Sequence, residues 1–156
     1  MRAVLILLAT LVFISGVSGF NAGEVEESAL SGFKQILDLW RSENYDGLYA
    51  RLTHPPNRGW DYFASRIVYA SRIPACCWEQ LQKVTSVATG PDQAVINATV
   101  GMEVEGVGTR FVTRDFVLKR IDGEWKLPMQ DILYLSDYNQ QRIPRKIYER
   151  EIGHSF

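Results

Sequence analysis

The sequence predicts an α+β domain with three N-terminal helices packed on the concave face of a curled, four-stranded antiparallel sheet. Apolar residues recur at helical spacing in the first half of the chain. From Trp78 onward they alternate instead, and turn signals separate the alternating runs at strand-length intervals. The strongest of these signals is Asp122-Gly123, because an Asp-Gly pair favours the type I′ turn that matches the twist of a hairpin. Helices grouped before strands are typical of α+β architecture, with the helices on one face of the sheet.

Three segments carry the apolar stripe of an amphipathic helix. The first has acidic residues near its start and Arg41 at its end, as the helix dipole favours. A loop over 54–59, with two prolines and a glycine, separates the second helix from the third, and Pro74 ends the third. We therefore expect helices over Glu24–Arg41, Tyr45–Leu52 and Trp60–Arg72.

The rest of the domain is predicted to form the four strands. The second strand alternates most regularly, and Gly101 within it indicates a twist or a close packing contact. In the third strand the apolar phase slips, which predicts a β-bulge near Asp115. The strands are expected over Trp78–Thr89, Gln93–Glu105, Thr109–Ile121 and Glu124–Leu135.

The N-terminal segment has the features of a signal peptide. Arg2 supplies a positive charge, an apolar run follows over Ala3–Val17, and Gly19 is a small residue at the cleavage position. A membrane-spanning helix usually needs about 20 apolar residues, so an uncleaved anchor is the weaker alternative. We predict a signal peptide over 1–19, a folded domain over 20–135 and a polar tail over 136–156. The protein is then periplasmic or secreted, and it touches a membrane only through the signal segment if that segment stays attached.

Composition and motifs argue against several functions. The formal net charge is −1, which gives no broad basic surface for nucleic acid. The two histidines, His54 and His154, have no cysteine or acidic neighbours at ligand spacing, so neither a metal site nor a cofactor is predicted. No phosphate-binding glycine-rich loop and no serine-nucleophile motif occurs in the sequence.

The two cysteines of the chain are adjacent, Cys76 and Cys77. Adjacent cysteines cannot join distant segments, so the fold depends on its core rather than on a disulfide framework. In one interpretation, one thiol packs as a small apolar group while the other faces the opposite side of a strand. In the other interpretation, the pair closes into a strained, redox-active vicinal disulfide. Disulfide geometry penalises so close a pair, so the first interpretation is favoured.

Two stretches carry a family resemblance: Phe33-x-x-Ile36-Leu37-x-x-Trp40-x-x-x-x-Tyr45-x-x-Leu48-Tyr49 and Phe116-Val117-Leu118-x-x-x-Asp122-Gly123-x-Trp125-Lys126-Leu127. With them the chain resembles the nuclear transport factor 2-like superfamily of cone-shaped, cystatin-like α+β domains. The resemblance covers 24–135. It implies a curled sheet around a hollow, and domains of this type often form a homodimer through the open sheet face. The short strands that many relatives have between their helices are not evident in this sequence.

The resemblance also suggests where a site would lie. Enzymes of this superfamily, such as the ketosteroid isomerase type, use an Asp base with Tyr or Asp donors inside an apolar cone, which makes Asp131 the best acid–base candidate. A solvated or arginine-paired Asp131 at a strand end is the favoured interpretation, because one Asp with scattered tyrosines is not a specific constellation. The predicted pocket for a small apolar ligand consists of Trp40, Tyr49, Tyr62, Trp125, Leu127 and Met129.

The preferred function is therefore an exported, non-catalytic domain that binds a small apolar ligand or a protein partner. One alternative is a small isomerase or hydrolase-like enzyme that uses Asp131 with a tyrosine donor. Another is a redox-responsive module based on Cys76 and Cys77.

Overall fold

A computed structural model describes residues 21–138, and this part of the chain has an α+β fold with four α-helices and one mixed six-stranded sheet. The predicted signal peptide and the part of the predicted tail after residue 138 lie outside the described residues. The helices are α1 (Ala22–Arg41), α2 (Tyr45–Ala50), α3 (Trp60–Ile67) and α4 (Met129–Ser136), with a 3₁₀ turn η1 (Cys77–Glu79). The strands are β1 (Leu52–Thr53), β2 (Arg72–Pro74), β3 (Leu81–Gly90), β4 (Gln93–Val104), β5 (Gly108–Ile121) and β6 (Glu124–Pro128).

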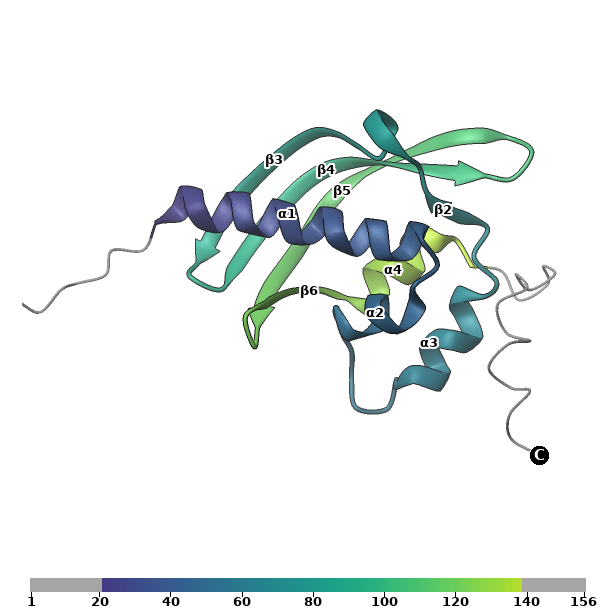
Figure 1. Ribbon diagram of the computed structural model, residues 1–156, viewed down its shortest axis with the longest axis horizontal. Coiled ribbons are helices and arrows are strands. Elements are labelled where there is room, and N and C mark those ends of the chain that lie inside the picture. The colour runs from purple at the N-terminus through teal and green to yellow at the C-terminus, as the bar shows by residue number, and fades with distance from the viewer. Residues whose placement is uncertain (1–20, 139–156) are drawn as a thin grey trace, which may run out of the picture.

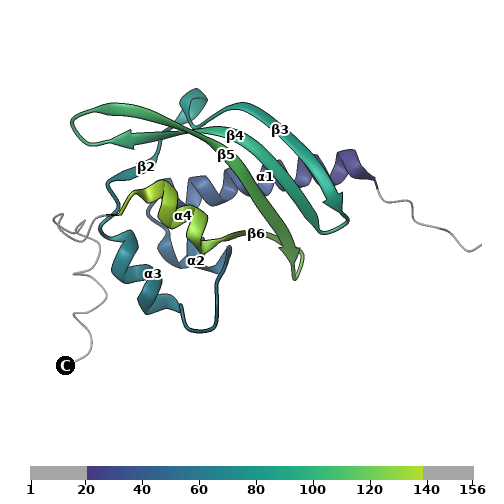
Figure 2. The ribbon, with the colours of Figure 1, turned by 180° about the vertical axis from the view of Figure 1, so that it is seen from behind.

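The sheet has the order β1-β6-β5-β4-β2, and β3 pairs with the remaining length of β4. The pair β1–β6 is parallel and the other pairs are antiparallel. Helix α1 lies across one face of the curled sheet, while α2, α3 and α4 gather beside one end of it (Figure 1). Seen from behind, the long strands β3, β4 and β5 lie in front of α1 (Figure 2).

The first helix and the central strand confirm their predicted patterns. The side chain of Asn21 caps α1 by accepting from the Glu24 N–H, and the apolar stripe of α1 is buried. On β4, the alternate residues from Ala94 to Met102 are all fully buried. Helix α1 also reaches β5 in the core, where the ring of Phe33 lies 4.7 Å from that of Phe116 on β5 between centroids.

The hairpin between β5 and β6 also has the predicted turn. Asp122 has φ 53° and Gly123 has φ 81°, so both central residues adopt the left-handed conformation that a type I′ turn requires.

The prediction of a fourth strand over Glu124–Leu135 is wrong after Pro128. Proline has no N–H for a sheet ladder, and the chain turns at that point into α4. In α4 six of the eight residues are buried, including the adjacent residues Ile132 and Leu133, so burial does not alternate as it would on a strand with one buried face.

The second and third helices end earlier than predicted, because short strands follow them. Leu52 leaves α2 to pair with Leu127 in β6, and Arg72 pairs with Val104 in β4. The short strands that the sequence did not reveal are therefore present as β1 and β2. Side-chain and backbone contacts strengthen the β1 junction, since Arg51 Nε donates to the Trp125 carbonyl over 2.9 Å.

The predicted bulge near Asp115 is wrong. The register of β4 and β5 runs without interruption from Gln93–Lys119 to Val104–Gly108. Register shifts lie in β3 instead, between Gln82 and Thr85, where Lys83 has φ 49°, and between Ala88 and Gly90. The apparent phase slip in β5 comes from apolar residues that face away from the helices and are exposed: Phe111, Val117 and Ile121.

The outer strand β3 is tied to the first helix. The Ala88 N–H donates to Glu26 Oε1 over 3.0 Å, and the Ser86 hydroxyl donates to the Glu26 carbonyl over 3.2 Å. Strand β3 also begins later than predicted, at Leu81 rather than Trp78, because Cys77–Glu79 form η1.

Candidate functional site

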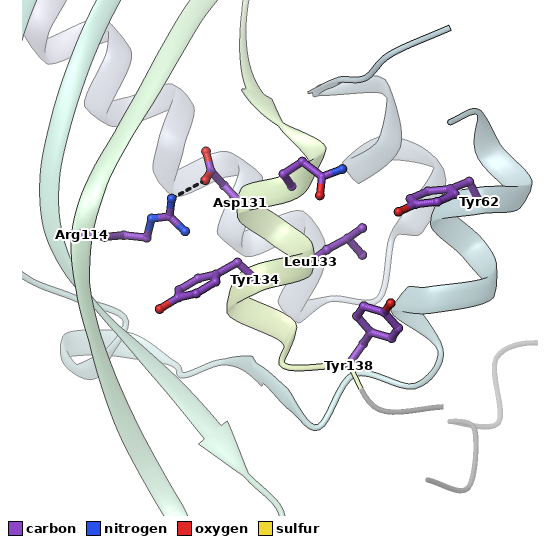
Figure 3. Close-up of a pocket in the computed structure, with 7 residues that line it drawn as sticks. Tyr62, Arg114, Asp131, Leu133, Tyr134 and Tyr138 are labelled. Carbon is purple, nitrogen blue, oxygen red and sulfur yellow. Dashed lines mark ion pairs between the residues drawn. The ribbon is translucent and has the colours of Figure 1, made fainter. Parts of the chain in front are cut away.

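Asp131 and Arg114 form an ion pair beside the end of the sheet. Asp131 lies in the first turn of α4, not on a strand as predicted, and its side chain points towards β5 (Figure 3). Arg114 projects from β5 on the same face as Phe116, and its Nη2 lies 2.9 Å from Asp131 Oδ1. The Asp131 carboxylate thus sits near the positive end of the α4 dipole and against a guanidinium.

Burial sets the proton affinity of this carboxyl. The Asp131 side chain is 13% exposed and that of Arg114 is 33% exposed. Burial raises the pKa of Asp131, and the Arg114 charge lowers it by a smaller amount, so the net direction is upward. The pair is therefore a partly desolvated ion pair, whose charged form is less favourable than its short distance suggests.

A hollow of about 440 Å³ opens over α4, between β5 and α3. Three of its seven lining residues are tyrosines, and Arg114 lies over the ring of Tyr134 with 4.5 Å from Cζ to the centroid. On the α3 side, Arg66 lies 3.5 Å from the centroid of the Tyr62 ring. The lining residues are Tyr62, Arg114, Gln130, Asp131, Leu133, Tyr134 and Tyr138.

Most of the predicted pocket residues lie elsewhere. Trp40, Trp125, Leu127 and Met129 are buried in the core, where α1 fills the inner face of β6. The contact is so close that a Cβ on Gly32 would lie 2.6 Å from Trp125 Cβ. The interior of the curled sheet is thus packed with side chains, and the hollow lies at its end.

The two tyrosines of the predicted pocket lie in different places. Tyr62 lines the hollow. Tyr49 packs against the edge of Trp60 and holds the exposed His54, with 2.9 Å between the Tyr49 hydroxyl and His54 Nε2. His54 is therefore engaged with α2 rather than with the hollow.

Sequence reasoning missed Arg114, Gln130, Leu133, Tyr134 and Tyr138. A signal for part of this set was present, because Pro128 followed by a helix would place Asp131 and Tyr134 three residues apart on one helix face. The residues around Arg114 in the sequence did not indicate that it lines the hollow. Its position there depends on the pairing of β5 and on the position of α4, which the sequence pattern did not predict.

The adjacent cysteines lie far from the hollow in sequence and are free thiols. Cys76 is half-buried and Cys77 is exposed. Within residues 21–138, no three His, Cys, Asp or Glu side chains gather as a group that would hold a metal ion.

No helix within the described range is both long enough and apolar enough to cross a membrane. No model of a protein family matches the chain, and no curated protein matches it either.

Proposed function

We propose that the chain is an exported, non-catalytic domain of the nuclear transport factor 2-like type that binds a small, mainly apolar ligand over α4. The hollow carries this proposal. Aromatic walls with a few well-placed polar groups are typical of small-molecule sites, whose volumes are roughly 300–1,000 Å³. The hollow of about 440 Å³ falls in that range, with three tyrosines, Leu133 and one ion pair in its lining.

The arrangement of elements supports the family part of the proposal. A long first helix across a curled sheet is what the resemblance implies. The short strand β1 between α2 and α3 adds to it, because many members of that superfamily have short strands between their helices.

Arg114 is the polar group that would orient the ligand. A guanidinium has five N–H donors in a fixed plane, and Asp131 forms an ion pair at Nη2. A ligand with a carbonyl or acidic group at one end would meet the remaining donors while its apolar part lies on Tyr134.

Titration of the full chain with the fluorescent probe anilinonaphthalene sulfonate, which combines aromatic rings with an anionic group, tests the ligand site. Tyr134→Ala should weaken probe binding about tenfold, which corresponds to about 1.4 kcal/mol. Arg114→Leu should weaken binding of this anionic probe but not of an uncharged naphthalene. Val117→Ser, on the exposed outer face of β5, is the matched control. If Val117→Ser reduces binding and Tyr134→Ala does not, the probe binds the outer face and the proposal is refuted.

Export has a direct test. The protein recovered from outside the cytoplasm should begin at residue 20 when its N-terminus is sequenced. A protein that starts at Met1 and stays with the membrane fraction would instead be anchored.

The proposed partner is a second copy, bound through the face of the sheet that α1 does not cover. Val87, Val95 and Val117 form a cross-strand row there, because Val87 pairs with Val95 and Val95 with Val117. Val87 is 57% exposed and Val117 is 39% exposed, and Phe111 and Ile121 extend the apolar surface along β5. Sedimentation analysis should give a dimer that Val117→Asp converts to a monomer. A wild-type monomer at high concentration would contradict this.

One observation favours an enzyme as the second candidate. Asp131 is a buried carboxyl with a raised pKa that lines the hollow, which is the setting of a general base next to an apolar substrate. Such an enzyme would catalyse exchange of the α-protons of a small cyclic ketone in deuterated water, measured by proton NMR. Asp131→Asn should abolish that exchange and leave probe binding intact. No exchange above the buffer rate by the wild-type chain would exclude this reaction.

A further inference from the structure

The adjacent cysteines lie on a short loop that β4 holds at both ends. The Ala75 N–H donates to the Gly101 carbonyl over 2.8 Å, and the Gly101 N–H donates to the Gln80 carbonyl over 3.0 Å. A Cβ at position 101 would overlap the carbonyl oxygen of Glu79, so the loop passes directly over this glycine. The loop between these two hydrogen bonds is therefore fixed relative to the sheet.

The outer part of this loop is open to solvent. Cys77 is exposed, and Trp78 beside it is 75% exposed. A reagent dissolved in water can therefore reach the Cys77 sulfur without any movement of the core.

The backbone places the two thiols on one side of the chain. Cys76 is extended, with φ −88° and ψ 164°. In an extended chain the next side chain points to the opposite side. Cys77, however, has φ 62°, a conformation that is uncommon for residues other than glycine. This rotation turns the Cys77 Cβ to the same side as the Cys76 Cβ.

We propose that Cys76 and Cys77 form a reversible dithiol–disulfide couple that exchanges with small-molecule disulfides. The Cys77 thiolate attacks one sulfur of the external disulfide, which forms a mixed disulfide and releases one thiolate. The Cys76 thiolate then attacks the Cys77 sulfur, closes the Cys76–Cys77 bond and releases the second thiolate. The protein loses two electrons and two protons, and the external disulfide is reduced to two thiols.

The two thiols differ in a way that suits this order. The neighbouring Cys77 side chain, followed by partial burial, raises the pKa of Cys76. Cys77 is exposed whereas Cys76 is half-buried, so an external reagent meets Cys77 first and Cys76 is left for the second step.

The closed form should be easy to reduce. Adjacent Cα atoms lie about 3.8 Å apart, which is below the roughly 4.4–6.8 Å separation of ordinary disulfides. Strained, exposed disulfides are the labile ones, so the couple should close only under oxidising conditions and reopen readily. This inference does not depend on the ligand site over α4.

The test equilibrates the full chain with mixtures of oxidised and reduced glutathione, followed by acid quenching and intact mass spectrometry. In the oxidising mixtures, the expected product is a monomer that has lost two hydrogen atoms, with both thiols lost together in a thiol titration. Excess reduced glutathione should restore both thiols. Two free thiols at every ratio, glutathione left on either cysteine as the end product, or a disulfide-linked dimer would each overturn the proposal.

Two serine variants test the order of the steps. Cys76→Ser should stop at a stable glutathione adduct on Cys77, because the second thiol is missing. Cys77→Ser should react at least tenfold more slowly than Cys76→Ser with oxidised glutathione. If Cys77→Ser forms its adduct as fast as Cys76→Ser, Cys77 is not the attacking group. Urea unfolding of both variants checks that they are folded.

Discussion

Trp40 and Trp125 are buried tryptophans that differ in one hydrogen bond, and this difference predicts different responses to the same substitution. The Trp125 Nε1–H donates to the Ser28 hydroxyl over 2.8 Å. The Trp40 Nε1 is buried and has no partner among the described residues. Substitution by Phe removes the same atoms at both positions, so the volume lost is equal and the hydrogen bond is what distinguishes them.

The expected difference follows from the two N–H groups. A buried donor without a partner destabilises the folded state by about 1–3 kcal/mol, so its removal in Trp40→Phe offsets part of the cost of the smaller ring. Trp125→Phe instead loses a hydrogen bond worth about 1 kcal/mol. It also weakens the contact with Arg120, whose Cζ lies 5.2 Å from the centroid of the Trp125 ring. Trp125→Phe should therefore be more destabilising than Trp40→Phe by about 2 kcal/mol.

Urea unfolding followed by circular dichroism measures both free energies of unfolding without depending on tryptophan fluorescence. The slopes with urea should match that of the wild type, so that the midpoints report stability. If Trp40→Phe is as destabilising as Trp125→Phe at equal slopes, the reasoning fails, and the Trp40 N–H has a partner.

Three further changes test other parts of the structure. Because burial raises the folded-state pKa of Asp131 above its unfolded value, this carboxyl stabilises the fold below the unfolded pKa and loses that contribution as the pH rises through the folded pKa. Urea unfolding at a series of pH values should therefore show the wild type losing stability relative to Asp131→Asn across that window. Gly101→Ala should lower the free energy of unfolding by about 1–3 kcal/mol, because its Cβ meets the Glu79 carbonyl. Gly123→Ala should lower it by about 1–2 kcal/mol through φ 81° alone, while the matched control Gly90→Ala, in open space without a positive φ, should change it less.

Apolar periodicity and turn residues were enough to predict the first helix, the central strand and the hairpin turn. The stripe through Phe33 and Trp40 gave α1, the alternation through Ile96 gave β4, and Asp122-Gly123 gave the turn. These features depend on residues close together in the chain, so periodicity and turn chemistry determine them.

The missed elements depend on distant residues. Strands β1 and β2 are two and three residues long, too short for any periodicity, and they form because β6 and β4 offer pairing partners. The error at α4 was different, since Pro128 was a visible stop signal and the alternation was nevertheless extended past it. That error also put Asp131 on the wrong element, so an arginine partner for Asp131 was expected but could not be identified as Arg114.

The contacts of Arg51 with β6 and of Glu26 with β3 have a consequence for solubility. Both outermost long strands of a sheet expose backbone groups that can recruit another chain and begin aggregation. On one side the Leu127 N–H already donates to the carbonyl of Arg51, the residue before β1, over 3.0 Å. On the other side the Glu26 carboxylate occupies the Ala88 N–H. These contacts hinder the pairing of another strand at both borders of the sheet, so the proposed dimer would use the face of the sheet rather than a strand edge.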